Sequence, residues 1–168
     1  MSYQEKKTIT SILTGALVLA AYCIYAFGKH QPGAGTSSDL KFWAMTMLIF
    51  IGIGVAASIV IQIVFHILLS ISIAVKGKIQ NQDLDDKEIE KQIDAEMVED
   101  EMDKLIELKS NQIGFILAVI GFVAGLVTLA FGNPPVVMLN ILFISFSAGS
   151  LLEGFAQLYY YRKGWAHG

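Results

Sequence analysis

The chain has 168 residues, of which 54% are apolar and 16% are charged, and its mean hydropathy is +0.56. Soluble domains carry about a quarter charged residues, so this composition excludes an ordinary soluble globular domain. The net charge of −3 and the single cysteine, Cys23, argue against nucleic-acid binding, an internal disulfide and a cysteine-rich metal site.

Four apolar segments are long enough to cross a bilayer, which takes roughly 20 helical residues. We predict one membrane domain over residues 1–168, with transmembrane helices at about 9–28, 42–66, 113–132 and 136–161. The prolines in Gly132–Pro135 cannot continue a helix and predict a tight turn between the last two spans. The predicted fold class is therefore all-α, an integral membrane four-helix bundle of two hairpins.

The second apolar segment is longer than a bilayer is thick. Asp39 is a suitable N-cap for this helix, and the apolar run from Phe42 to Val75 would reach roughly 50 Å as a helix. A bilayer core is only about 30 Å thick. The excess apolar end needs a cover, which could be the rest of the chain, a second copy or the lipid surface. We expect a second copy together with the charged segment that follows.

That charged segment, about residues 76–112, is predicted to be a helical cytoplasmic arm. It holds twelve of the fifteen acidic residues and six of the twelve Lys and Arg residues. No Gly or Pro interrupts Asp85 to Ser110, which favours helix. Apolar and acidic side chains near its end are the candidate partner-binding residues: Val98, Met102, Leu105, Ile106, Asp100, Glu101 and Asp103.

The basic residues predict the orientation. Ten Lys and Arg residues lie at the two termini and in the arm, whereas the short loops on the other side hold only Lys29 and Lys41. Because Lys and Arg near span ends favour the cytoplasm, both termini and the arm are expected to be cytoplasmic, in a multi-pass protein of the inner membrane. Trp43 is expected at the opposite interface, in an aromatic belt.

Glu153 is the residue in the spans that most needs an explanation. A carboxyl group inside a membrane helix is costly and points to a functional site. Ser145 and Gln157 share its helix face by their four-residue spacing, and no Lys or Arg lies at a matching depth, so burial is expected to favour the protonated form. It is either a proton or cation site or a neutral group hydrogen-bonded between helices. Polar neighbours at a matching depth are Thr14, Ser58 and Gln62.

Small residues form a stripe along the third span at Gly114, Ala118, Gly121 and Gly125. Such stripes let helices approach closely in lipid, here more plausibly within the bundle than between copies. The sequence shows no metal-binding histidine pattern, phosphate-binding loop or nucleophile motif. We therefore expect a non-enzymatic protein without catalytic residues, metal or cofactor.

The stretch Asp100-Glu101-Met102-Asp103, followed by Ile106 and Lys109-Ser110, resembles the Asp-Glu-Arg-Asp signature of a family of small, uncharacterised prokaryotic four-helix membrane proteins. In that family the signature precedes the third membrane helix. The ending Tyr161-Arg162-Lys163-Gly164 is similar to that family's usual ending, whereas Met102 replaces its usual arginine. The resemblance implies a regulatory or sensing role, because such proteins are often encoded beside small helix-turn-helix repressors.

Two functions follow as hypotheses. The first is a membrane protein, expected to be a homodimer, that binds or regulates a cytoplasmic partner protein through its acidic arm. The alternative is a small proton- or cation-coupled transporter or permeation unit that uses Glu153.

Overall fold

The computed structural model describes residues 3–29, 36–79, 91 and 101–163. They form four long helices, and the described residues include no strand, which confirms the all-α class. Each helix is long and apolar enough to cross a membrane. The helices are α1 (Tyr3–Lys29), α2 (Thr36–Ile79), α4 (Glu101–Ala130) and α5 (Pro135–Lys163).

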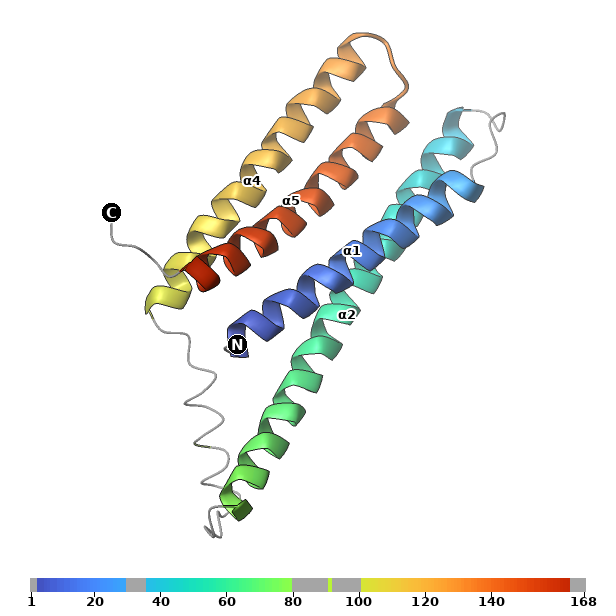
Figure 1. Cartoon of the computed structure of the whole chain (residues 1–168). Helices are drawn as coiled ribbons and strands as arrows, with labels where there is room; N and C mark the ends of the chain where they lie inside the picture. Colours follow the sequence, from blue (N-terminus) through green and yellow to red (C-terminus); the bar gives the residue numbers. More distant parts are fainter. Residues whose placement is uncertain (1–2, 30–35, 80–90, 92–100, 164–168) are drawn as a thin grey trace.

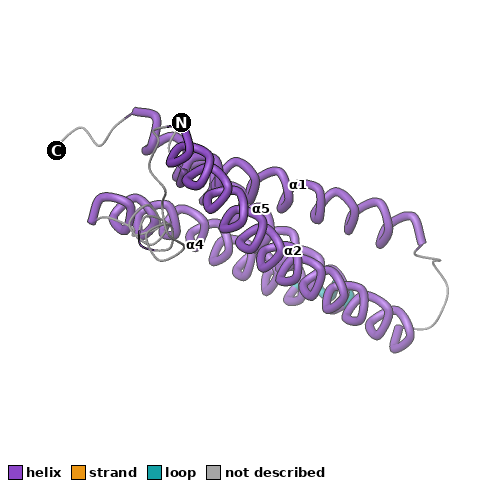
Figure 2. The backbone as a smooth tube through the Cα atoms, turned by 90° about the horizontal axis from the view of Figure 1, so that it is seen from below, coloured by secondary structure: helices purple, strands orange, loops and turns teal. Residues whose placement is uncertain are grey.

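Helix α5 is the centre of the arrangement. It contacts α4 on one side and both α1 and α2 on the other, and Figures 1 and 2 show it between α4 and the α1–α2 pair. The start of α1, the start of α4 and the end of α5 lie together at one end of the molecule (Figure 1). We call this the polar end, and we call the opposite end, where α4 turns into α5, the turn end.

The α4–α5 contact is built on small residues, as the stripe predicts. The buried residues of α4 include Gly114, Ala118, Gly121 and Gly125, and α5 brings Gly149 against them. A Cβ atom added to Gly114 would lie 2.8 Å from the carbonyl oxygen of Gly149. The two backbones therefore touch, and the expected packing of the stripe inside the bundle is confirmed.

The turn between α4 and α5 has a well-defined cap. Gly132 takes a positive φ of 80°, its amide donates to Leu129, and the amide of Asn133 donates to Thr128. This pair of hydrogen bonds is the Schellman motif, which ends helices at a glycine. Pro135 then opens α5, where a missing backbone N–H has no cost. The predicted tight turn is confirmed.

Aromatic side chains hold α1 and α2 together near the turn end. Tyr22 and Ala26 of α1 and Trp43 and Met47 of α2 form a buried cluster. Trp43 is only 2% exposed, and its ring packs edge-on against Phe27 at 5.3 Å between centroids. This packing joins the start of α2 to the end of α1, and the interfacial position expected for Trp43 stays a prediction.

Helix α2 is continuous from Thr36 to Ile79, and its apolar candidate span covers 34 residues, Leu40–Ile73. It begins three residues before Asp39, so Asp39 lies inside the helix and is not its N-cap. Most of α2 is exposed on the described molecule, but Leu69 and Ile73 are buried near its end. The excess length predicted for this helix is confirmed.

The expected arm is described in part. Its first residues, up to Ile79, continue α2, and its last residues, from Glu101, are the start of α4, which runs on without a break into the third apolar segment. The candidate partner-binding residues Val98 and Asp100 lie outside the described residues.

Candidate functional site: adjoining polar and apolar cavities

A polar cavity of about 230 Å³ lies at the polar end, between α1, α4 and α5. It contains three carboxyl groups, from Asp103 and Glu107 of α4 and Glu153 of α5, and one ammonium group, from Lys7 of α1. The remaining lining residues carry hydroxyl or amide groups, apart from one glycine. They are Gln4, Thr8, Ser11, Ser150, Gly154, Gln157 and Tyr161.

Glu153 lines this cavity, and the face of α5 that carries Glu153 packs against α4. Its Cβ atom is next to Gly114, where an added Cβ would be 3.2 Å away. The carboxyl group of Glu107 is near enough for its negative charge to act on Glu153. Across the cavity, the hydroxyl group of Thr8 donates to the side-chain oxygen of Gln157 at 3.3 Å, which joins α1 to α5. Glu153 therefore sits among charged and polar groups of three helices.

The three carboxyl groups lie apart around the cavity and do not meet at a common binding position. Among the described residues, no group of three His, Cys, Asp or Glu side chains is close enough to hold a metal ion. The lining itself holds three carboxyl groups against one ammonium group, in a cavity large enough for a hydrated or bulky cation, or for a proton relay between carboxyl groups.

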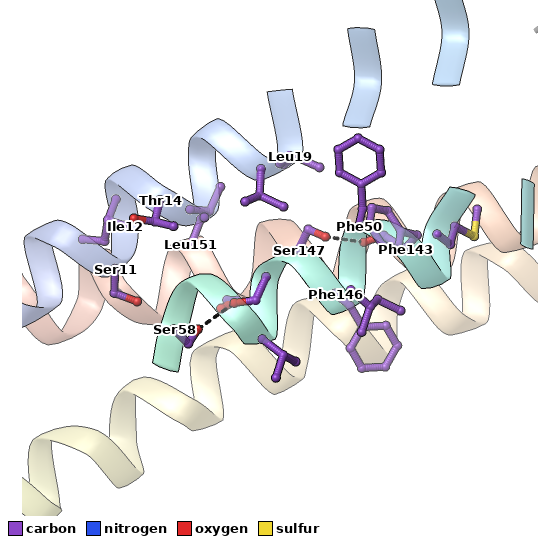
Figure 3. Close-up of a pocket in the computed structure, with 18 of the residues that line it drawn as sticks. Ser11, Ile12, Thr14, Leu19, Phe50, Ser58, Phe143, Phe146, Ser147 and Leu151 are labelled. Atoms are coloured by element: carbon purple, nitrogen blue, oxygen red, sulfur yellow. Dashed lines mark hydrogen bonds between the residues drawn. The ribbon is translucent and has the colours of Figure 1, made fainter. Parts of the chain in front are cut away.

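A larger apolar cavity of about 700 Å³ lies between α1, α2 and α5 (Figure 3). Two of its hydroxyl groups donate to their own helices, from Ser58 to the carbonyl oxygen of Gly54 at 2.9 Å and from Ser147 to that of Phe143 at 2.8 Å. These bonds, drawn as dashed lines in Figure 3, leave the wall mainly apolar. The cavity exists because α2 diverges from α1 toward the polar end (Figure 1).

The two cavities adjoin. Ser11 of α1 and Ser150 and Gly154 of α5 line both of them. Toward the turn end, the apolar cavity reaches Phe50 and Phe143, whose rings contact Tyr22 at centroid distances of 5.5 and 4.2 Å. The hollow thus runs from charged groups at one end of the molecule to an aromatic cluster at the other.

The structure separates the intramembrane residues predicted as one site. Glu153 and Gln157 line the polar cavity together. Ser145 lies nearer the turn end, where it contacts Gly121 of α4. Gln62 is exposed on α2 and lines neither cavity. No residue of α2 is among the described residues that line the polar cavity.

The candidate partner-binding residues at the start of α4 face different ways. Met102 and Leu105 are 43% and 50% exposed, whereas Ile106 is 3% exposed. Glu101 is exposed, and Asp103 turns toward the polar cavity. An apolar partner surface here therefore consists of Met102 and Leu105, without Ile106.

Several residues in and near the polar cavity are missing from the sequence prediction. Lys7 was expected outside the spans, and yet it lines the same cavity as Glu153, as does Glu107. Ser110 is fully buried on α4, one turn before Gly114, and its hydroxyl oxygen has no hydrogen-bond partner among the described residues. The sequence signal for these residues is the helix-forming stretch that precedes the first and the third apolar segment without a break. Because of it, α1 and α4 begin well before their apolar segments.

No family model matches the chain, and neither a curated protein nor a solved structure is significantly similar to it. The resemblance to the Asp-Glu-Arg-Asp family therefore stays a prediction.

Proposed function

We propose that this chain is an integral membrane protein that moves protons or other cations, with Glu153 as the central binding group. The single observation that carries the proposal is the position of Glu153 in a cavity with Asp103 and Glu107. Three carboxyl groups against one ammonium group attract cations. A carboxyl group in a membrane helix is the group that proton and cation pathways use.

The topology that fits this role is two membrane hairpins with the polar end in the cytoplasm. The described basic residues at the polar end are Lys6, Lys7, Lys104, Lys109, Arg162 and Lys163, and Lys and Arg favour the cytoplasmic side. The polar cavity would then load from the cytoplasm. The protein resides in the inner membrane in this proposal, and the arm connects the two hairpins on the water-facing side.

The aromatic cluster is the barrier in this proposal. Tyr22, Phe50 and Phe143 lie at the far end of the apolar cavity, and Tyr22 donates a hydrogen bond to Asn140 of α5 at 2.9 Å. A cation that enters at Glu153 passes outward only when these rings separate. The described arrangement corresponds to a state that is loaded from the polar end.

Flux measurements on the Glu153→Gln variant test the proposal. The protein is reconstituted in liposomes with a pH-sensitive dye inside, and a potassium gradient with valinomycin sets the potential. Wild-type protein should dissipate an imposed gradient of protons or cations, and the variant should lose at least 90% of that flux. The matched control is Glu101→Gln, which removes an exposed carboxyl group outside both cavities and should keep the flux. Equal flux from the Glu153→Gln variant and wild type would refute the proposal.

A second function is favoured by the start of α4. Met102 and Leu105 present an exposed apolar surface beside acidic groups, which suits a cytoplasmic partner protein with a basic rim. In this alternative, a homodimer binds a regulatory partner through the arm. Capture from native membranes with a Met102→Ser, Leu105→Ser variant tests it. Loss of a stoichiometric partner would support the idea, and retention of every partner would exclude it. Native mass spectrometry of the same sample reports whether the protein is a dimer.

A further inference from the structure

Because a polar cavity adjoins an apolar one, the pair is suited to a ligand that has both a polar and an apolar part. Ser11, Ser150 and Gly154 line both, so a molecule in the polar cavity can extend directly into the apolar cavity. A simple proton or metal-ion pathway has no use for about 700 Å³ of apolar space. Ligand-binding cavities for small organic molecules have volumes of roughly 300 to 1,000 Å³.

The charges define one half of such a ligand. Asp103, Glu107 and Glu153 line the polar cavity with Lys7 as the one cation, so a cationic head group is favoured over an anionic or neutral one. These carboxyl groups are not gathered as metal ligands, since no described cluster could hold a metal ion. Dispersed carboxyl groups suit a bulky cation whose charge is spread over several atoms.

The apolar cavity defines the other half. Most of its lining residues are aliphatic or aromatic, and two of its hydroxyl groups, those of Ser58 and Ser147, donate hydrogen bonds to their own helices. Phe50, Phe143 and Phe146 are among the lining residues, and aromatic faces attract organic cations as well as apolar groups. An apolar substituent placed here leaves water and gains about 25 cal/mol for each Å² of buried apolar surface.

We propose that the adjoining cavities bind an amphiphilic organic cation, with its charged centre in the polar cavity beside Glu153 and its apolar part in the cavity between α1, α2 and α5. This inference names the substrate class of the transport proposed above and rests on the same site. The competing occupant, a lipid acyl chain or another neutral apolar molecule, needs no carboxyl group and becomes an outcome of the test.

Two glycines of α2 give a matched pair of variants. Gly54 lines the apolar cavity, whereas Gly52 does not. An added Cβ atom at either position would meet nothing within 4 Å, so each helix accepts a larger side chain. Gly54→Leu fills part of the cavity, and Gly52→Leu places the same side chain on the same helix outside it.

The experiment is equilibrium dialysis of tetraphenylphosphonium against full-length protein in lipid nanodiscs, with tetramethylammonium and neutral triphenylphosphine oxide as comparison probes. The phosphonium should bind at least tenfold more tightly than either probe. Gly54→Leu should weaken its binding at least tenfold, and Gly52→Leu should leave the Kd within twofold of wild type. Glu153→Gln should weaken phosphonium binding at least tenfold without changing binding of the neutral probe.

Any one of three results would overturn the inference. They are equal binding of the neutral and cationic probes, an unchanged Kd for Gly54→Leu, and an unchanged Kd for Glu153→Gln. Proton flux measured on the same preparations separates the two proposals. If Gly54→Leu loses phosphonium binding but keeps proton flux, both stand. If Glu153→Gln keeps full flux but loses phosphonium binding, the transport proposal fails and the binding site stands.

Discussion

Along α4 and α5 the backbones touch, whereas α1 meets α2 through large aromatic side chains near the turn end. Gly114 and Gly149 allow the first contact. Tyr22 and Trp43 make the second, and beyond them α1 and α2 diverge toward the polar end (Figure 1). Small residues along the whole contact therefore produce a close helix pair, whereas a contact confined to one end leaves the rest of α1 and α2 free to diverge.

Glycine itself does not decide which kind of contact forms. Gly52 and Gly54 of α2 are also glycines in an apolar helix, and yet nothing lies within 4 Å of a Cβ added at either. A glycine marks a close approach only where a second helix supplies the opposing surface. Four predictions test this difference between the two helix pairs.

The largest effect is expected from Gly149→Leu. The added Cβ would lie 2.6 Å from the carbonyl oxygen of Gly114, so the α4–α5 backbones must separate, at a cost of about 3 kcal/mol. The free energy of unfolding in bicelles, measured by steric trapping, reports it. Gly52→Leu is the control and should change stability by less than about 0.5 kcal/mol. Similar losses from both variants would contradict the close α4–α5 contact.

The end of α2 offers two adjacent leucines with different surroundings. Leu69 is 8% exposed and Leu68 is 56% exposed. Leu69→Ala should destabilise the protein by about 2 kcal/mol, because it leaves a cavity, and Leu68→Ala should have almost no effect. The same unfolding measurement applies. Equal values for the two variants would mean that the end of α2 does not pack as described.

Gly132 makes the turn that sets the α4–α5 pair in register. Its φ of 80° is unfavourable for residues with a Cβ atom, so Gly132→Ala should cost about 1.5 kcal/mol. Gly132→Asn should cost less, because asparagine tolerates this conformation. Gly28→Ala, in α1 and with no close neighbour, is the control. A neutral Gly132→Ala would exclude the positive φ.

The smallest effect concerns the hydrogen bond from Tyr22 to Asn140, one of those that join α1 to α5. Tyr22 is fully buried and donates to Asn140 at 2.9 Å, so Tyr22→Phe should lose about 1 kcal/mol of unfolding free energy. Tyr159→Phe removes an exposed bond from Lys163 at 2.8 Å and should be close to neutral. If the two variants behave alike, Tyr22 does not connect α1 to α5 as described.

Part of the site was within reach of sequence reasoning. A tight turn around Gly132 and Asn133 makes residues equally distant from it neighbours on α4 and α5, and Gly121 and Ser145 are such a pair. The same register brings Glu153 close to Gly114 and one to two turns from Glu107. The sequence prediction treats the arm and the third span as separate units, and so it does not place Glu107 near Glu153. In the structure, the end of the arm and the third span belong to one helix, α4.

The four apolar helices and the α4–α5 turn follow from the sequence alone, because apolar span length, proline and glycine act locally. The helices themselves extend beyond the predicted spans, most of all α2 and α4. The positions of Lys7 and Gln62 required the tertiary structure. Lys7 joins Glu153 because α1 packs against α5, and Gln62 does not because α2 diverges. The sequence contains Tyr22 and Trp43, but only the tertiary structure shows that they join α1 to α2 near the turn end and that an apolar cavity lies between α1, α2 and α5.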